Sequence, residues 1–351
     1  MPKARLKENK GLPTRWTFYH NAYYYRVPEG LESSWDNKTK FKLGKSLPEA
    51  FRAYAKRVEI NSNTKTIGDL LDRYLLQVVP EKAVATQQGN QIQIKKLRSV
   101  FGGMPLLPFH PQLVYQYVDK REYKIAAHRE IEVLSHAYTK AVEWGLINKH
   151  PFKGEVRLKG ERPRDRYVED WEIIECLALP SKKSIGGVAA VQAYIKLKLL
   201  TGMSRGDLLR LEPARQFMED GIHVQRHKTA SSSGKRTIYQ WTPALIAAKD
   251  QALGARPVDI SPYLFCTRRG ESYMNEETGN PPGWKSMWQR FFARVIKETK
   301  VTKHFTEHDL RAKVGSDAES LQHAMELLAH ADSRTTERIY RRKAVLVRPM
   351  K

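Results

Sequence analysis

The hydrophobic positions of the first 60 residues fall into short aromatic runs separated by turn-forming residues. Asn21 and the stretch Pro28-Glu29-Gly30 interrupt these runs, and residues of these types favour turns. We therefore predict three strands of a small antiparallel sheet, at residues 16–19, 23–27 and 40–43. Ser46 then precedes a segment with helical spacing, 47–58, which predicts a helix covering one face of the sheet.

Residues 66–150 carry hydrophobic positions at helical spacing in four successive segments. Thr66 followed by Asp69 is a capping-box pattern, which marks the beginning of the first helix. The other three helices are predicted at 85–101, 111–121 and 126–146. The polar segment 61–65 predicts a linker between these helices and the sheet.

From residue 168 onward the pattern is mixed. Two alternating runs predict a strand hairpin at 221–227 and 236–242. Gly202 ends a helix, and Ser204 with Asp207 begins a short one. The longer helices are predicted at 171–179, 188–200, 283–299, 306–315, 320–329 and 334–343. The chain is thus predicted to be an α+β multidomain protein: a small sheet with a helix at 1–60, an all-helical domain at 66–160, and a mixed, mainly helical domain at 165–351.

The charge balance narrows the possible partners. The 61 Lys and Arg against 38 Asp and Glu leave a net charge of +23, which favours nucleic acid over an anionic membrane surface. No run approaches the roughly 18 apolar residues of a membrane span. The charged N-terminus predicts no secretory signal. Cys176 and Cys266 are far apart, which excludes a thiolate zinc site, and we expect a cytoplasmic protein.

Basic residues of the N-terminal arm, the sheet and the segment 152–167 are candidate DNA contacts. They are Lys3, Arg5, Arg15, Lys40, Lys42, Lys159, Arg162 and Arg164. The aromatic residues of the sheet fit two interpretations equally well: a hydrophobic core and a DNA-reading surface. The segment 152–167 fits a solvated connector as well as a DNA contact.

Two basic residues of the C-terminal half occupy positions suited to an anion. Arg205 lies at a predicted helix N-terminus, where backbone N–H groups and the helix dipole favour negative charge. Lys228 lies beside the predicted hairpin turn, from which its ammonium reaches a neighbouring groove. Each is weak evidence alone, since arginine is common in first turns and lysine commonly keeps a sheet edge soluble.

The segment around Thr306 is more informative. Thr306 caps a predicted helix, and the spacing of three residues places His308 and Arg311 on one face of it. That face combines a proton carrier with a fixed cation. His330 follows on the next predicted helix.

Tyr340 is the only tyrosine after Tyr273 and lies in a basic segment. Its basic neighbours are Arg338, Arg341, Arg342 and Lys343. A tyrosine in such surroundings would be drawn towards a phosphate, and its oxygen is a nucleophile where the site stabilises the phenolate. A core tyrosine on an amphipathic basic helix explains the same pattern.

Together these residues resemble the tyrosine recombinase family, specifically integrases of the lambda type. The resemblance rests on the motifs Thr201-Gly-x-x-Arg205, His227-Lys228-Thr, His308-Asp-Leu-Arg311, Leu327-Leu-Ala-His330 and Thr335-Thr-Glu-Arg-Ile-Tyr340, which follow one another in family order. It covers nearly the whole chain. It implies an arm-type DNA-binding domain at 1–60, a core-binding domain at 66–160 and a catalytic domain of the tyrosine recombinase type at 165–351.

The resemblance implies a role for each site residue. Tyr340 would attack a DNA phosphodiester and form a 3′-phosphotyrosyl intermediate, while Arg205 and Arg311 would hold the non-bridging oxygens. Lys228 would be the general acid for the leaving 5′-oxygen. His308 and His330 would position the phosphate and assist proton transfer, and Asp207 stands where the family often has an acidic residue that orients the site.

The implied enzyme integrates and excises a mobile element, such as a viral genome, without a cofactor, a metal ion or ATP. The implied partners are double-stranded DNA with core-type and arm-type attachment sites, a homotetramer assembled on that DNA, a host DNA-bending protein and an excisionase. The compartment would be the cytoplasm of a bacterial host, at the nucleoid.

The sequence departs from the family pattern at Ala329, where a glycine is usual, and at the segment 312–315. It also has one additional residue between His330 and Tyr340.

Three alternatives remain at this point. His304-Phe-Thr-Glu307-His308 fits an inverted zinc-peptidase motif, but Thr306 would cap the helix between the two histidines. A DNA-binding protein without strand-transfer activity, such as a decayed integrase or a repressor, explains the charge and the domains. A type IB topoisomerase would share the chemistry, but the separate basic domain at the N-terminus favours a recombinase.

Residues 344–347 are a further strand candidate, which would pack on a neighbouring subunit.

Overall fold

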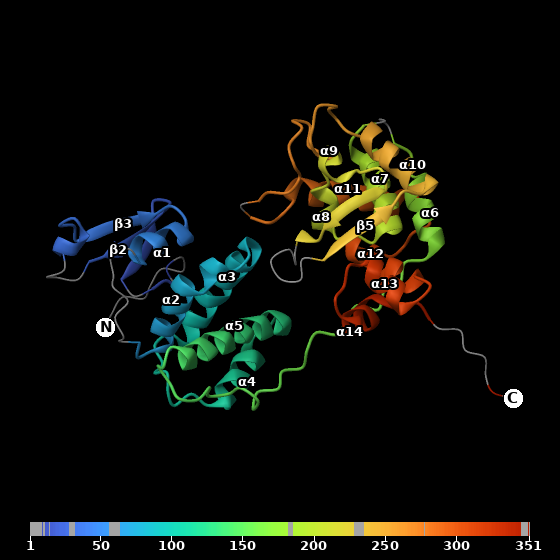
Figure 1. Ribbon diagram of the computed structural model, residues 1–351. Helices are drawn as coiled ribbons and strands as arrows, with labels where there is room; N and C mark the ends of the chain where they lie inside the picture. The colour runs from blue at the N-terminus through green and yellow to red at the C-terminus, as the bar shows by residue number, and fades with distance from the viewer. Residues whose placement is uncertain are drawn as a thin grey trace. The chain divides into compact units, whose positions relative to one another are not determined.

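The computed structural model of the chain describes residues 9, 11–13, 15–27, 32–55, 64–181, 185–227, 235–276, 278–344 and 350. The chain divides into two compact units, Met1–Glu161 and Arg162–Lys351 (Figure 1). In the described part, no helix has both the length and the apolar composition needed to cross a membrane. Most of the predicted linker 61–65 lies outside the described residues, so the boundary between the first two predicted domains stays a prediction.

The first unit begins with a three-stranded antiparallel sheet in the order β1 (Trp16–Tyr19), β2 (Ala22–Arg26) and β3 (Lys40–Gly44). A short 3-10 helix, Glu32–Trp35, precedes β3. The helix α1 (Leu47–Ala55) packs against the sheet, with the ring centres of Trp16 and Phe51 4.7 Å apart. Trp16 and Tyr25 are buried, whereas Tyr19 is exposed. Most aromatic residues of the sheet are therefore its core.

Four helices follow: α2 (Ile67–Gln77), α3 (Val84–Phe101), α4 (Pro111–Lys120) and α5 (Lys124–Glu143), with a 3-10 turn at Val79–Glu81. The predicted capping box begins α2, since Thr66 Oγ1 accepts from Asp69 N at 3.1 Å and Asp69 Oδ2 accepts from Thr66 N at 2.9 Å. Leu71, Leu134 and Tyr138 are fully buried between these helices. Their hydrophobic cluster continues into the sheet.

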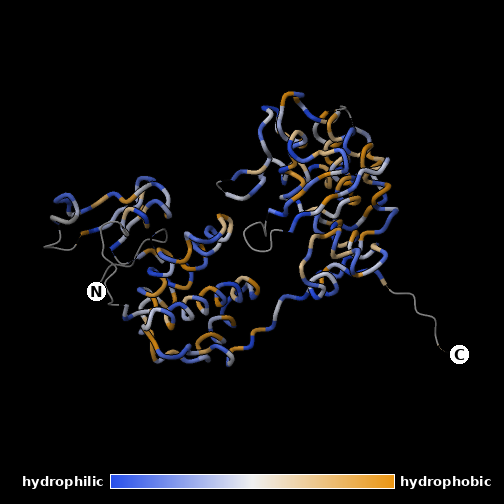
Figure 2. Tube along the Cα trace, viewed as in Figure 1, coloured by the Kyte–Doolittle hydropathy of each residue, from blue (hydrophilic) through white to orange (hydrophobic). Residues whose placement is uncertain are grey.

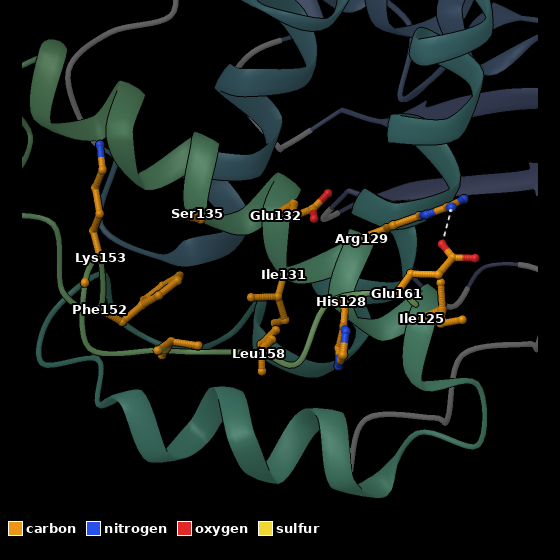
Figure 3. A pocket seen from close by; sticks show the side chains of 13 residues that line it. Ile125, His128, Arg129, Ile131, Glu132, Ser135, Phe152, Lys153, Leu158 and Glu161 are labelled. Carbon is orange, nitrogen blue, oxygen red and sulfur yellow. Dashed lines mark hydrogen bonds and ion pairs between the residues drawn. The ribbon is translucent and has the colours of Figure 1, made fainter. Parts of the chain in front are cut away.

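The segment after α5 returns along this helix and lines a pocket with it (Figure 3). Phe152 is buried, and Leu158 packs against the same core as Ile131 of α5. Arg129 of α5 forms an ion pair with Glu161 at 3.2 Å. Phe152 and Leu158 therefore attach the first part of the segment 152–167 to this core, while most of the other residues of the segment are exposed, as expected for a connector.

The second unit is built around α7 (Gly187–Thr201), which is apolar on nearly every side, as expected for a buried helix. Tyr194 and Ile195 are fully buried in the main hydrophobic cluster of this unit. Figure 2, which colours the chain by hydropathy, shows hydrophobic segments running through this unit. The helices α10 (Pro243–Gly254), α11 (Pro282–Glu298) and α12 (Glu307–Asp317) pack against α7. Gly202 ends α7 in the left-handed conformation (φ 65°), as predicted.

Shorter elements complete this unit. They are α6 (Asp170–Ala178), α8 (Arg205–Leu209), α9 (Pro213–Gln216), the antiparallel hairpin β4 (Gly221–Gln225) and β5 (Arg236–Gln240), α13 (Leu321–Leu327), α14 (Ser333–Thr335) and a π-helix, Thr336–Tyr340. The predicted single helix at 334–343 is therefore wrong in form: α14 passes into the π-helix, and helical structure ends at Tyr340. Most of the strand candidate 344–347 lies outside the described residues.

Candidate active site

Tyr340 and His308 form the centre of the site. The phenol oxygen of Tyr340 lies 3.1 Å from Nε2 of His308, and the two ring centres are 5.1 Å apart. Burial, followed by the charge of Arg342, lowers the pKa of His308 to about 4. The imidazole is therefore neutral near pH 7, and its Nε2 shares one hydrogen bond with the phenol, while Arg342 Nη2 lies 3.5 Å from its Nδ1.

Arg311 lies one turn after His308 on α12, on the same face. The helix begins at Glu307 because Thr306 and Asp309 form a capping box, in which Thr306 N donates to Asp309 Oδ2 at 2.9 Å. The Arg311 guanidinium is 4% exposed and lies 5.6 Å from the centre of the Tyr340 ring. The predicted i, i+3 spacing therefore brings a cation and an imidazole to one tyrosine.

Two backbone carbonyls fix Arg311. Its guanidinium donates to the carbonyl oxygen of Gly202 and, at 2.6 Å, to that of Leu328. These contacts join the end of α7 to the end of α13. Because a guanidinium has five donors, it can hold both carbonyls and still present N–H groups to a ligand.

His330 is buried between Arg311 and Thr336. Arg311 donates to its Nε2 at 3.2 Å, so the ring proton is on Nδ1, which lies 2.9 Å from Thr336 Oγ1. Burial, followed by the charge of Arg311, lowers the pKa of His330 to about 3. The ring centres of His330 and Tyr340 are 4.8 Å apart. His330 is thus a neutral, oriented imidazole beside the tyrosine.

The buried neutral His330 should make stability depend on pH. Its ordinary pKa of 6.5 applies in the unfolded chain, which binds a proton at pH values where the folded protein does not. We therefore expect the free energy of unfolding to fall by about 1.4 kcal/mol per pH unit below about pH 6 from this group. Urea unfolding at about pH 7 and about pH 5 tests this. His330→Gln should show a shallower dependence than the wild type, and equal slopes would contradict the assignment.

The π-helix accounts for the additional residue between His330 and Tyr340. A π-turn contains one more residue than an α-turn and commonly occurs at functional sites. Here it spans Thr336–Tyr340 and ends at the tyrosine itself. Ala329, which replaces the usual glycine, has φ 47°, a conformation that a glycine would adopt without strain. Gly315 of α12 allows the backbone at Tyr340 to lie close to this helix, since a Cβ at position 315 would lie 2.9 Å from Tyr340 Cβ.

Arg205 contacts Glu307 rather than Tyr340. Its Nη1 lies 3.1 Å from Glu307 Oε2, and the other oxygen of this carboxylate accepts from Trp284 Nε1 at 2.9 Å. Glu307 directly precedes His308, so Arg205 joins the site through this carboxylate. Among the described residues, no hydrogen bond links Arg205 to His308, Arg311, His330 or Tyr340.

Lys228 lies outside the described residues, but its neighbour His227 is fixed. Asp207 Oδ1 accepts from His227 N at 3.0 Å, and Oδ2 accepts from Ser204 Oγ at 2.7 Å. Asp207 therefore joins the beginning of α8 to the end of β4. This contact holds the strand end from which Lys228 continues.

Sequence reasoning missed several buried charged residues. Lys198 is 1% exposed and donates to the carbonyl of Met203 at 2.8 Å, and burial lowers its pKa to about 7. Arg342 donates to the fully buried Asp309 at 2.7 Å. Lysine on a helix ordinarily indicates an exposed face, so no local signal marks Lys198 as buried.

The candidate DNA contacts differ in their surroundings. Lys3 and Arg5 lie outside the described residues, and Arg15, Lys42, Lys159 and Arg162 are exposed. Lys40 lies over the ring of Tyr19 at 4.1 Å. Arg164 forms an ion pair with Asp309 at 2.9 Å.

The zinc-peptidase alternative does not fit the structure. Thr306 caps α12, so His304 lies before the helix, where its ring packs against Phe292 with centres 4.4 Å apart. Across the part of the chain that the structure describes, no group of three or more His, Cys, Asp or Glu could hold a metal ion. Cys176 and Cys266 are buried and free.

Comparison with solved structures identifies known proteins that share this fold. No protein-family model and no curated protein matches the sequence. A lambda integrase dimer bound to a COC′ core site is 19% identical, with 99% of each chain covered and a TM-score of 0.60. The lambda integrase tetramer bound to a Holliday junction is 19% identical, with 92% and 97% covered and a TM-score of 0.57.

The Tn1549 transposon integrase in complex with circular intermediate DNA shares the same architecture. It is 15% identical, with 78% of this chain and 93% of that chain covered and a TM-score of 0.62. The fold class predicted from the sequence is therefore confirmed: this chain has the mixed α+β architecture of the lambda and Tn1549 integrases.

Proposed function

We propose that this protein is a site-specific DNA recombinase that cleaves and rejoins DNA through a 3′-phosphotyrosyl intermediate. The observation that carries the proposal is the phenol of Tyr340, held 3.1 Å from His308 Nε2 and beside the buried Arg311. A nucleophile, a neutral imidazole and a fixed cation are then close together, which is the arrangement that phosphoryl transfer requires. The shared fold supports the same function.

The chemistry follows from these positions. The Tyr340 oxygen would attack a backbone phosphorus, forming the tyrosyl–phosphate bond as the bond to the 5′-oxygen breaks. His308 and His330 would position the phosphate and assist removal of the phenol proton. Lys228, in the role that the motif implies, would give a proton to the leaving 5′-oxygen. A 5′-hydroxyl of a partner strand then attacks the same phosphorus and releases Tyr340.

Positive charge would stabilise the transition state. Arg311 is fixed before DNA binds, so its N–H groups need no reorganisation when negative charge develops on the non-bridging oxygens. Arg205 would contribute after exchanging Glu307 for phosphate. The covalent intermediate keeps the phosphodiester energy, so religation requires neither ATP nor a metal ion.

The wider assignment extends this activity to a mobile element. We propose integration and excision, with an arm-type DNA-binding domain at 1–60, a core-binding domain at 66–160 and a catalytic domain at 165–351. A homotetramer would assemble on attachment-site DNA, as the tetramer on a Holliday junction does for lambda integrase. A DNA-bending protein and an excisionase would be accessory partners, and the reaction would take place in the cytoplasm on the host chromosome.

A covalent trapping assay tests the proposal. Full-length protein is incubated in EDTA with nicked DNA fragments from the region flanking its gene, and SDS gels are examined for a protease-sensitive protein–DNA band. We expect a band on the strand with the cleaved 3′ end for the wild type and none for Tyr340→Phe. Tyr273→Phe is the matched control, because the hydroxyl of this partly buried tyrosine makes, among the described residues, a single long hydrogen bond of 3.9 Å to Met287 Sδ. It should form the band normally.

The other outcomes are equally decisive. A band that persists in Tyr340→Phe would overturn the assignment of the nucleophile. Salt-sensitive binding of the same fragments without a band from the wild type would support the alternative, a DNA-binding protein without strand-transfer activity.

A further inference from the structure

The C-terminal end of α13 is held by donors from three other elements. Its terminal carbonyl oxygens have no partner within the helix and must find one elsewhere. Tyr239 donates to Leu327 at 3.0 Å and Arg311 to Leu328 at 2.6 Å. In the next two positions, Arg226 approaches the carbonyl of Ala329 at 3.5 Å and Lys235 donates to that of His330 at 3.2 Å. Arg226 and Lys235 therefore lie beside His330, at the loop end of the β4–β5 hairpin.

Arg226 uses few of its donors in this arrangement. Its contact to Ala329 is at the outer limit of a hydrogen bond, and its Nε is buried without a partner among the described residues. Buried N–H groups are nearly always satisfied in folded proteins, so an unsatisfied one indicates a missing partner. The guanidinium of Arg226 therefore keeps unused donors in this arrangement.

The surroundings of Arg226 favour an anion as that partner. Arg311, Arg226 and Lys235 all act electrostatically on His330, and each lowers its pKa. Within the described residues, none of these three cations forms an ion pair with a carboxylate. Asp207 also acts on the nearby Tyr239, but its two oxygens accept from Ser204 and His227. The cluster is therefore an uncompensated positive site.

We propose that Arg226 binds a non-bridging oxygen of the scissile phosphate as a further guanidinium beside Arg311. This inference rests on the proposed recombinase function and identifies a catalytic residue that the motifs do not mark. Arg226 has no carboxylate partner to exchange among the described residues, whereas the charge of Arg205 is compensated by Glu307 at 3.1 Å. Two guanidinium groups on one phosphate neutralise its charge and fix its orientation.

The test separates charge neutralisation from helix capping. Arg226→Gln keeps an amide donor for the Ala329 carbonyl but removes the charge, so a capping role would survive this change. Single-turnover cleavage is measured on two nicked substrates, one with an ordinary scissile phosphate and one with an uncharged methylphosphonate. Wild type and Tyr340→Phe in the same assay report whether the proposed function itself holds.

We expect Arg226→Gln to cleave the phosphate about 10²–10³-fold more slowly than the wild type, the usual cost of removing one charge-stabilising donor. On the methylphosphonate, which lacks the charge, it should cleave within about tenfold of the wild type. Arg294→Gln is the matched control on α11, where Arg294 pairs with Glu298 at 2.7 Å. It should match the wild type on both substrates.

Two results would overturn the inference while leaving the recombinase function intact. One is cleavage of the phosphate by Arg226→Gln at the wild-type rate. The other is an equal loss on both substrates, which would indicate a structural role only. Arg205→Gln is examined in parallel, and a charge-dependent loss in this variant but not in Arg226→Gln would exclude Arg226 from the groups that bind the phosphate. Absence of cleavage by the wild type would instead contradict the proposed function.

Discussion

Replacing Arg311 with lysine is expected to slow DNA cleavage by about 10³-fold while the protein remains folded. The guanidinium holds the carbonyls of Gly202 and Leu328 and contacts His330 at the same time. A lysine ammonium has the charge but cannot make this planar set of contacts. The positive charge would therefore be kept, and the fixed geometry of the cation would be lost.

Single-turnover cleavage of nicked attachment-site DNA measures this effect, and circular dichroism confirms that the variant is folded. Arg256→Lys is the matched control, because Arg256 also donates to a backbone carbonyl, that of Ser261 at 3.2 Å, at a position the proposal does not use. It should cleave at the wild-type rate. An Arg311→Lys variant that cleaves within about tenfold of the wild type would argue against Arg311 as the central cation.

Replacing Asp309 with asparagine is expected to lower the free energy of unfolding by about 3–5 kcal/mol, the usual cost of breaking a buried ion pair. Asp309 is fully buried and accepts from Arg342 Nη1 at 2.7 Å, from Thr306 N at 2.9 Å and from Thr306 Oγ1 at 2.8 Å. Burial alone would raise the pKa of this carboxyl, but the bonds from Arg342 and Thr306 lower it instead. The charge therefore has to be present for Arg342 to stay buried.

This change should also affect the nucleophile. Ser316 Oγ donates to the carbonyl of Tyr340 at 2.8 Å and accepts from Arg342 N at 2.7 Å, so the two residues are held as one segment. Release of Arg342 would loosen this segment. We expect Asp309→Asn to lose cleavage activity as well as stability.

Urea unfolding measures the free energy of unfolding of Asp309→Asn and of the wild type. Arg164→Ala is the matched control, because the Arg164 side chain also pairs with Asp309 but is 52% exposed, and exposed pairs contribute only about 0–1 kcal/mol. The double variant Asp309→Asn, Arg342→Leu should recover part of the loss, since it removes the unpaired charge. A loss for Asp309→Asn no larger than that for Arg164→Ala would contradict the buried-pair interpretation.

Local signals in the sequence were sufficient to predict a helix end where the residues that form that end are neighbours in the chain. The capping boxes at Thr66 and Thr306 and the glycine stop at Gly202 all occur as predicted, because each depends on residues at most four positions apart. The helix α10 was missed even though Thr242 caps it and Pro243 opens it. Its hydrophobic residues are not confined to one stripe, so the helical period is weak.

The sequence by itself determined most element types, the basic character of the chain and the set of residue types suited to phosphoryl transfer, because these follow from composition and short-range spacing. Only the tertiary structure decided which cations stand together. Arg226 and Lys235 meet the end of α13 from 103 and 95 residues away, and Arg205 pairs with Glu307 across 102 residues. Such contacts depend on how α7, α12, α13 and the hairpin pack around one core, and no local pattern encodes that packing.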